Sequence, residues 1–222
     1  MNYLPFSIGV LSWKGYDSLE NSLYSYKKNG LSNMTNNKFV CLPEYKEEGI
    51  KIARKYNYKP ILIRDNIGIL GGFKKLAEEM PKGPILLLEN DLELVESKKE
   101  TYRQLKKSIH LLNEYSIIQV RLRSKINPGE PFEGLRKYKQ YWSNNFISKI
   151  KRFIRPKKSH KLIGTSTYYM ENPEKNHPGI VQKISKGFYL VPSSVLTWTN
   201  LAILVDRDIY LNTIIKTAEE TE

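Results

Sequence analysis

Short apolar runs alternate with amphipathic stretches through the first half of the chain. The apolar runs cover residues 6–11, 38–42, 60–64 and 84–88. Each run is shorter than a typical helix and is followed by polar residues, which favours a buried strand. Helices are predicted where apolar residues recur with the helical period, over residues 17–28, 44–56 and 73–80. This alternation predicts an α/β fold with a mostly parallel central sheet flanked by helices.

Local signals support individual elements. Asp17 and Glu20 have the spacing of a capping box, and Asn29-Gly30 is a typical helix end. The run at 84–88 is apolar on both faces, as expected of a central parallel strand.

The regular alternation stops after a helix predicted at 97–115 and a strand at 117–122. Residues 124–165 have no clear period apart from a helix at about 145–154. Two further strands and a last helix are predicted at residues 187–192, at 202–205 and from about 209. We predict one domain over residues 1–222, whose acidic end is typical of the N-terminal domain of a longer protein.

Composition limits the class of protein. Hydrophobic residues make up 40% and charged residues 27% of the 222 residues, which is typical of a globular protein. The single Cys41 excludes an intramolecular disulfide framework and favours a reducing, cytoplasmic location. The first residues lack the pattern of a signal peptide, and no apolar run approaches the length of a membrane-spanning helix.

The net charge of +13 is concentrated in one segment. Residues 135–161 contain ten Lys or Arg and no acidic residue. Within this segment, Ile150, Phe153 and Ile154 fall near one face of the predicted helix, with basic residues around them. That pattern favours peripheral contact with an anionic membrane surface. A solvated loop whose lysines maintain solubility is the alternative.

Segments that contain polar residues follow four of the predicted strands at the edge where parallel strands end. They are residues 12–14, 43–45, 65–66 and 89–91. Ligands of open parallel sheets bind at this edge, which makes it the predicted site.

Glu89 and Asp91 leave the fourth strand as two carboxylates separated by Asn90. A turn there could aim both at one Mg²⁺ or Mn²⁺ ion that bridges phosphate oxygens. The alternative is an acidic loop that only ends the strand and caps a helix. Backbone N–H groups of residues 66–72 could likewise approach a phosphate, or their glycines could serve a simple turn.

The order of these elements, with "DNIGILGGFKKLAEE" before an apolar strand and "ENDLEL" after it, resembles family 2 glycosyltransferases of the GT-A fold. The family pattern closes on Asp-x-Asp, whereas this chain has Glu-x-Asp, with Asp91 as the expected principal metal ligand. The resemblance covers residues 6–95 and, less closely, 187–222. It implies a GT-A-like, Rossmann-related fold with a nucleotide-binding half at 1–123, a basic excursion at 124–186 and an acceptor-side half at 187–222.

The resemblance also implies an activity. A hexosyltransferase would move a sugar from a nucleotide-sugar donor, typically UDP-linked, to a hydroxyl of a glycan, lipid-linked or protein acceptor. The metal would be Mn²⁺ or Mg²⁺. The implied donor-binding residues are Ser12, Trp13, Glu44, Asn66, Gly72 and Asn90.

Later residues complete the implied site. Trp198 and Asn200 would border the sugar and acceptor. Glu219 or Glu220 would be the base for an inverting transfer, with Asp206 and Asp208 as rivals. His177, or less favourably His160, could be a third metal ligand. The alternatives are that Trp198 packs in the core, that Glu219 and Glu220 lie on a solvated helix end, and that His177 belongs to a turn.

Three other interpretations remain open from the residues. The positive charge and 15 tyrosines suit a nucleic-acid-binding module, although no recognition motif is present and no nucleic acid is expected as a partner. A nucleotidyltransferase would share the sheet and paired acids, but Ser12-Trp13-Lys14-Gly15 is a poor match to its Gly-rich loop. A non-catalytic transferase domain is the third.

Overall fold

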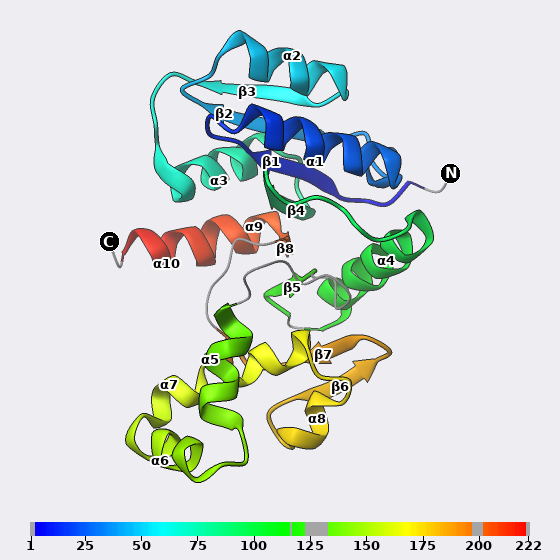
Figure 1. Ribbon diagram of the computed structural model, residues 1–222. Helices are drawn as coiled ribbons and strands as arrows, with labels where there is room; N and C mark the ends of the chain where they lie inside the picture. The colour runs from blue at the N-terminus through cyan, green and yellow to red at the C-terminus, as the bar shows by residue number, and fades with distance from the viewer. Residues whose placement is uncertain (1–2, 116, 123–132, 197–201, 221–222) are drawn as a thin grey trace. The chain divides into compact units, whose positions relative to one another are not determined.

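The computed structural model describes residues 3–115, 117–122, 133–196 and 202–220. The chain forms two compact units (Figure 1). The first comprises Met1–Leu122 with Asn200–Glu222, and the second comprises Arg123–Thr199. The change from one unit to the other coincides with the predicted start of the basic excursion.

The first unit is built on a six-stranded sheet in the order β3-β2-β1-β4-β8-β5. Its strands are β1 (Ser7–Leu11), β2 (Lys38–Pro43), β3 (Lys59–Ile63), β4 (Pro84–Glu89), β5 (Gln119–Arg121) and β8 (Ile203–Asp206). Neighbours from β3 to β4 pair in parallel, whereas β8 pairs antiparallel with both β4 and β5. The predicted α/β class and mostly parallel sheet are therefore confirmed.

Helices cover the sheet at the predicted places. They are α1 (Tyr16–Lys28), α2 (Glu47–Lys55), α3 (Gly68–Glu79) and α4 (Lys98–Glu114). The predicted stop of α1 is confirmed, because Asn29 is its C-cap and Gly30 has φ of 79°. The predicted capping box is wrong: Gly15 is the N-cap without a side-chain bond, and Glu20 instead forms an ion pair with Lys55 of α2.

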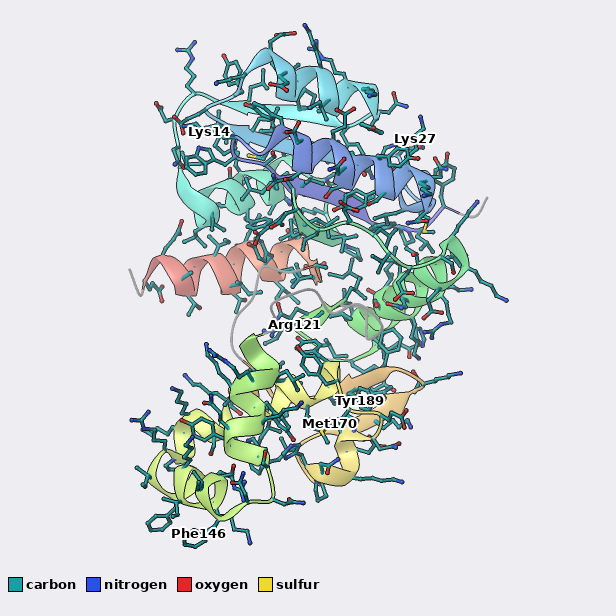
Figure 2. The ribbon with its side chains drawn as sticks, viewed as in Figure 1. Lys14, Lys27, Arg121, Phe146, Met170 and Tyr189 are labelled. Atoms are coloured by element: carbon teal, nitrogen blue, oxygen red, sulfur yellow. The ribbon has the colours of Figure 1, made fainter. Side chains whose placement is uncertain are left out.

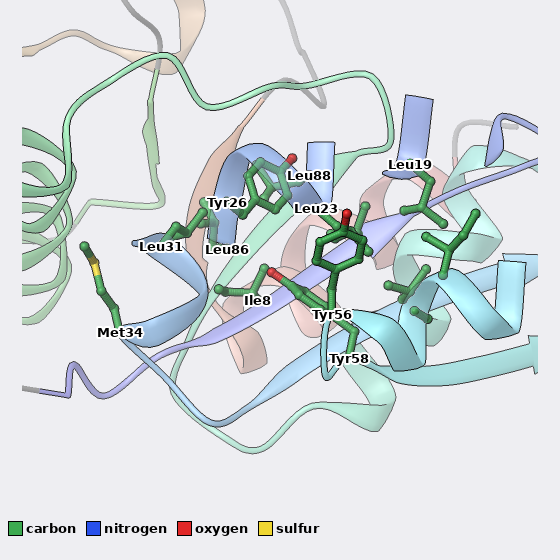
Figure 3. Close-up of a cluster of buried hydrophobic side chains, with 14 of the residues drawn as sticks. Ile8, Leu19, Leu23, Tyr26, Leu31, Met34, Tyr56, Tyr58, Leu86 and Leu88 are labelled. Atoms are coloured by element: carbon green, nitrogen blue, oxygen red, sulfur yellow. The ribbon is translucent and has the colours of Figure 1, made fainter. Parts of the chain in front are cut away.

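The hydrophobic core lies on both faces of the sheet because side chains alternate along each strand. From β4, Leu86 and Leu88 pack in the cluster beneath α1 and α2 (Figure 3), whereas Ile85 and Leu87 pack in the cluster beneath α3. All four side chains are buried, which confirms the prediction of a central strand that is apolar on both faces.

Helix α3 differs from the prediction at its start. The glycine-rich run was expected to be a loop, but the helix begins at Gly68, five residues before the predicted Phe73. A Cβ on Gly72 would lie 2.5 Å from Leu11 Cδ1, so this glycine permits close packing of the helix on β1. The 66–72 run is thus mostly helical, and packing accounts for Gly72.

The C-terminal residues return to the sheet as β8 and then form one continuous helical segment. Its parts are α9 (Arg207–Ile209), a π-helical stretch η4 (Tyr210–Ile215) and α10 (Lys216–Glu219). Buried Tyr210 and Ile215 pack in the cluster beneath α3. The last helix was predicted from about 209, and its start at Arg207 is set by Asp206, which caps it.

The second unit is more regular than its sequence suggests. Its elements are α5 (Glu133–Trp142), α6 (Phe146–Ile154), α7 (Pro156–His160), η2 (Ile163–Tyr168), α8 (Pro173–Asn176), β6 (Gln182–Ser185), β7 (Phe188–Leu190) and η3 (Ser193–Val195). The predicted helix at about 145–154 is confirmed as α6. The prediction that the rest of residues 124–165 has no regular structure is wrong for most of the described part, which is helical. The predicted strand at 187–192 is β7, which pairs with β6 in a separate hairpin. Among the helices of both units that the structure describes, none could cross a membrane.

Candidate functional site

The candidate site lies where the order of the strands in the sheet changes direction, between β1 and β4. Strand β1 has β2 on one side and β4 on the other, so the strand order reverses there. Leu11 and Glu89, near the carboxyl ends of these two strands, are register partners. Such a switch point opens a crevice outside the strand ends, where ligands of open α/β sheets bind. The predicted groups at residues 12–14 and 89–91 meet at this point.

A buried hydroxyl lies just past the end of β1. The Ser12 N–H donates to the Cys41 carbonyl at 3.0 Å and so continues the ladder with β2. The Ser12 side chain is buried, and its Oγ has no hydrogen-bond partner within the described residues. Because a buried polar atom without a partner is costly, this hydroxyl is available to a bound ligand or water.

Trp13, Lys14 and Glu44 form a cluster at the ends of β1 and β2 (Lys14 is labelled in Figure 2). The Trp13 Nε1–H donates to Glu44 Oε2 at 2.6 Å, and Lys14 Nζ lies 3.0 Å from the same oxygen. These contacts, the indole bond first, hold the pKa of the Glu44 carboxyl below its usual range. The Trp13 ring stays half exposed. Glu44 therefore fixes an accessible aromatic ring at the sheet edge.

The backbone of this cluster is strained. Lys14 has φ of 57° and Glu44 has φ of 49°, in the left-handed region that residues with a side chain rarely adopt. Such strain costs on the order of 1 kcal/mol per residue and concentrates at binding sites. The surrounding fold holds both turns in place.

Glu89 and Asp91 have different environments at the end of β4. Glu89 is half-buried, and burial raises the pKa of its carboxyl, with the nearby Asp91 charge as a second cause. Asp91 is exposed. Two neighbouring carboxylates offer the hard oxygen ligands that Mg²⁺ and Mn²⁺ prefer, so the chemistry of this pair fits such an ion. Over the described parts of the chain, no three or more His, Cys, Asp or Glu side chains group as a complete metal site.

Asn90 links the two strand ends. Its Nδ2 donates to the Gly15 carbonyl at 2.9 Å, and its own carbonyl accepts from Ser22 Oγ at 2.8 Å. A Cβ on Gly15 would lie 2.3 Å from Asn90 Nδ2, so the glycine admits the amide. Asn90 was predicted to contact the donor; its side chain holds the loop after β1 against the end of β4, between Glu89 and Asp91.

Helix α1 holds the loop that carries Asp91. The Tyr26 Oη–H donates to the Leu92 carbonyl at 2.5 Å, and Asn29 Nδ2 donates to the Leu94 carbonyl at 2.5 Å. Ser25 Oγ accepts from the Leu94 N–H at 2.8 Å. The positions of the contributing residues, Ser22, Ser25, Tyr26 and Asn29, follow the i, i+3, i+4, i+7 spacing of one helix face. Sequence analysis missed these residues, although that polar stripe was a readable signal.

The Tyr26 hydroxyl should be needed to hold the Asp91 loop. Tyr26→Phe keeps the buried ring but leaves the Leu92 carbonyl without this donor, which should cost about 1–2 kcal/mol of folding stability. Thermal unfolding checks this loss, with Tyr24→Phe on the exposed side of the same helix as the control. Equal stability of the two variants would contradict a holding role for Tyr26.

Most of the other predicted residues of the first unit already have hydrogen-bond or ion-pair partners. Asn66 Oδ1 accepts from the Gly68 N–H at 2.9 Å at the start of α3. Glu219 Oε1 lies 2.6 Å from Lys74 Nζ of the same helix α3. Glu220 is the exposed C-cap of α10. In Figure 2 the end of α10 lies on the side of the sheet where Lys14 is labelled. The rivals to Glu219 and Glu220 have structural roles, since Asp206 accepts from two helical N–H groups and Asp208 pairs with Arg207.

His177 belongs to the second unit and is buried there. Its Nε2 lies 2.7 Å from Tyr138 Oη, and its ring meets Trp142 edge-on at a centroid distance of 4.6 Å. These contacts give it a packing role, and burial lowers its pKa. His160 is exposed at the end of α7. Trp198 and Asn200 lie outside the described residues.

Folding stability should decrease as the pH is lowered, because His177 is buried. In the unfolded chain a histidine has a pKa of about 6.5, and in the folded protein the pKa of His177 is lower. The contribution of such a histidine to folding stability is complete above about pH 6.5 and is lost as the pH falls towards the folded pKa. The urea midpoint should therefore drop between about pH 7.5 and pH 5.5, and His177→Gln should remove part of the drop. His160→Gln is the matched control and should retain the full drop. An undiminished drop in the His177 variant would refute this assignment.

The sequence matches no model of a known protein family and no curated protein.

Proposed function

We propose that the chain is a glycosyltransferase that moves a sugar from a nucleotide-sugar donor to an acceptor hydroxyl, with UDP as the typical nucleotide. The observation that carries this proposal is the meeting of Glu89 and Asp91 with Ser12 and Trp13 at the switch point between β1 and β4. A nucleotide sugar needs what these residues offer: an aromatic face, a polar partner and oxygen ligands beside the diphosphate. The sequence resemblance to family 2 glycosyltransferases supports the same activity.

Trp13 and Ser12 would receive the nucleoside. The half-exposed indole, oriented by Glu44, can stack on a base, because its Nε1–H is already engaged and its ring remains accessible. The unpartnered Ser12 hydroxyl can bond a polar group of the nucleoside.

Asp91 and Glu89 would hold the metal ion. When bound, Mg²⁺ or Mn²⁺ neutralises charge on the leaving diphosphate. Asn90 and helix α1 keep the two carboxylates at the strand end, so little reorganisation is needed on binding.

The acceptor proton would pass to a carboxylate of the C-terminal helix. Glu220 is the better candidate, because Lys74 already neutralises Glu219. A base that removes the proton as the acceptor attacks opposite the leaving group gives inversion at the sugar.

A panel of sugar nucleotides, tested by thermal shift with and without Mn²⁺, examines the proposal. Binding of one donor at about 100 times its Kd stabilises a folded protein by about 2.7 kcal/mol, which is readily measured. We expect stabilisation by one donor only when Mn²⁺ or Mg²⁺ is present. The proposal fails if no donor stabilises the protein with either metal.

Product analysis separates the proposed activity from a nucleotidyltransferase. A glycosyltransferase releases the nucleoside diphosphate and leaves the sugar bound to the acceptor, whereas a nucleotidyltransferase releases pyrophosphate from a nucleoside triphosphate. Release of pyrophosphate would replace the proposal with the second activity.

A further inference from the structure

Helix α6 exposes its apolar side chains. The exposed fractions are 75% for Phe146, 64% for Ile147, 41% for Ile150, 88% for Phe153 and 67% for Ile154. An amphipathic helix of a globular protein normally turns such residues towards the core. Scattered exposed apolar residues are ordinary, but five on one nine-residue helix form a continuous surface. We call these five residues the α6 apolar face.

The polar side of α6 packs inward instead. Buried Ser148 donates through Oγ to the Gln140 carbonyl of α5 at 3.0 Å. Arg152 donates to the Tyr141 carbonyl and lies 5.0 Å from the centre of the Trp142 ring. The Asn145 side chain caps the helix by accepting from the Ser148 N–H. The helix is therefore held with its apolar face outward, and Figure 2 shows Phe146 projecting away from α5 and α7.

Two lysines border the α6 apolar face. At about 100° per residue, the five apolar side chains span an arc of about 120° from Phe153 to Ile147. Lys149 follows about 40° beyond Phe153, and Lys151 lies about 40° beyond Ile147. Both lysines are exposed. This arrangement, an apolar arc between two basic margins, is typical of a helix that lies in the plane of a membrane surface.

The residues that follow the helix in the sequence are rich in exposed lysine and arginine. Arg155 and Lys161 and, on α7, Lys157 and Lys158 are also exposed. Residues 135–161 contain no acidic residue. A surface of this kind complements an anionic surface and is not neutralised by carboxylates of its own segment.

We propose that the α6 apolar face is a docking surface for an anionic lipid bilayer, with Phe146 and Phe153 inserted and the surrounding lysines against the headgroups. A second copy of the chain fits less well, because face-to-face contact would bring the basic margins together. Nucleic acid would use the charge but not the three isoleucines, which cannot stack on bases. The proposal does not depend on the glycosyltransferase assignment.

Vesicle sedimentation of the whole chain tests the proposal. We expect binding to vesicles of phosphatidylcholine and phosphatidylglycerol at a ratio of about 7 to 3, and little binding to phosphatidylcholine alone. Phe146→Ser with Phe153→Ser should weaken the binding about 30-fold or more. Lys149→Gln with Lys151→Gln should weaken it about 20-fold.

Matched variants in the first unit separate this surface from general exposure and charge. Tyr24→Ser with Val95→Ser removes two exposed apolar side chains away from α6, and Lys51→Gln with Lys106→Gln removes two exposed helical lysines. Both controls should bind vesicles almost as the unchanged protein does. Circular dichroism and the thermal midpoint should remain unchanged in the Phe146 and Phe153 variant, since both side chains are exposed.

Three outcomes would overturn the proposal. The first is equal vesicle binding by the folded Phe146 and Phe153 variant. The second is dimerisation that this variant abolishes while the unchanged protein ignores vesicles. The third is retention on single-stranded RNA, sensitive to Lys149 and Lys151, without vesicle binding. Among these possibilities, only insertion of the two phenylalanines predicts that their loss strongly weakens vesicle binding.

Discussion

Asp91→Asn is expected to abolish the metal-dependent stabilisation by a sugar nucleotide and to lower transfer by about 100- to 1,000-fold. The variant keeps the size of the side chain but removes the better exposed of the two paired carboxylates. Charge stabilisation by a bound metal contributes several kcal/mol, and each 1.36 kcal/mol corresponds to about tenfold in rate. Thermal shift with the best donor and Mn²⁺, followed by the rate of nucleoside diphosphate release, measures both effects.

Glu93→Gln is the matched control for Asp91. Glu93 is an exposed acid in the same loop, two residues further along, and it has no place in the proposed metal site. Its variant should retain metal dependence and nearly full transfer. If the Asp91 and Glu93 variants behave alike, the Asp91 carboxylate is not the metal ligand.

Leu87→Ala should lower folding stability by about 3–4 kcal/mol. Leu87 is fully buried in the central strand β4, in the cluster beneath α3. Truncating a buried leucine removes transfer free energy and leaves a cavity, which together cost about 2.7–5 kcal/mol in cores of this kind. For a chain of this size the thermal midpoint should fall by about 6–16 °C, measured by circular dichroism.

Leu62→Ala tests the position of β3 at the edge of the sheet. Leu62 also lies in an apolar run, but β3 is the outer strand and this side chain is 44% exposed. Its truncation should cost less than about 1 kcal/mol, because the side chain loses little burial and leaves no closed cavity. Equal losses for Leu62 and Leu87 would be incompatible with the strand order.

The fold of the first unit was largely predictable from local pattern. The runs at 38–42 and 84–88 became β2 and β4 within one residue, because an apolar segment of five residues with polar ends is too short for a typical helix and favours a buried strand. The start of α3 was missed, because Gly68, Gly71 and Gly72 look like a loop. Gly72 lies within the helix because α3 packs so closely on β1 that a side chain there would clash with Leu11, and this contact is not visible in the local sequence.

The candidate site was predictable only as a set of strand ends. The spacing of Glu89 and Asp91 identified the carboxylates, and parallel topology brought them to the same edge as Trp13 and Glu44. The contact of Asn90 with Gly15 was not predictable, because it joins segments 75 residues apart. His177, a candidate metal ligand by residue type, is instead buried against Tyr138 and Trp142.

The sequence by itself determined where the strands and most helices of the first unit form, since their periodicity is a local property of the chain. It also determined the basic character of residues 135–161. Only the tertiary structure placed β8 between β4 and β5, anchored the Asp91 loop to α1 and turned the α6 apolar face outward. These features depend on contacts between distant segments, and the same apolar pattern on a helix can pack inward or face outward.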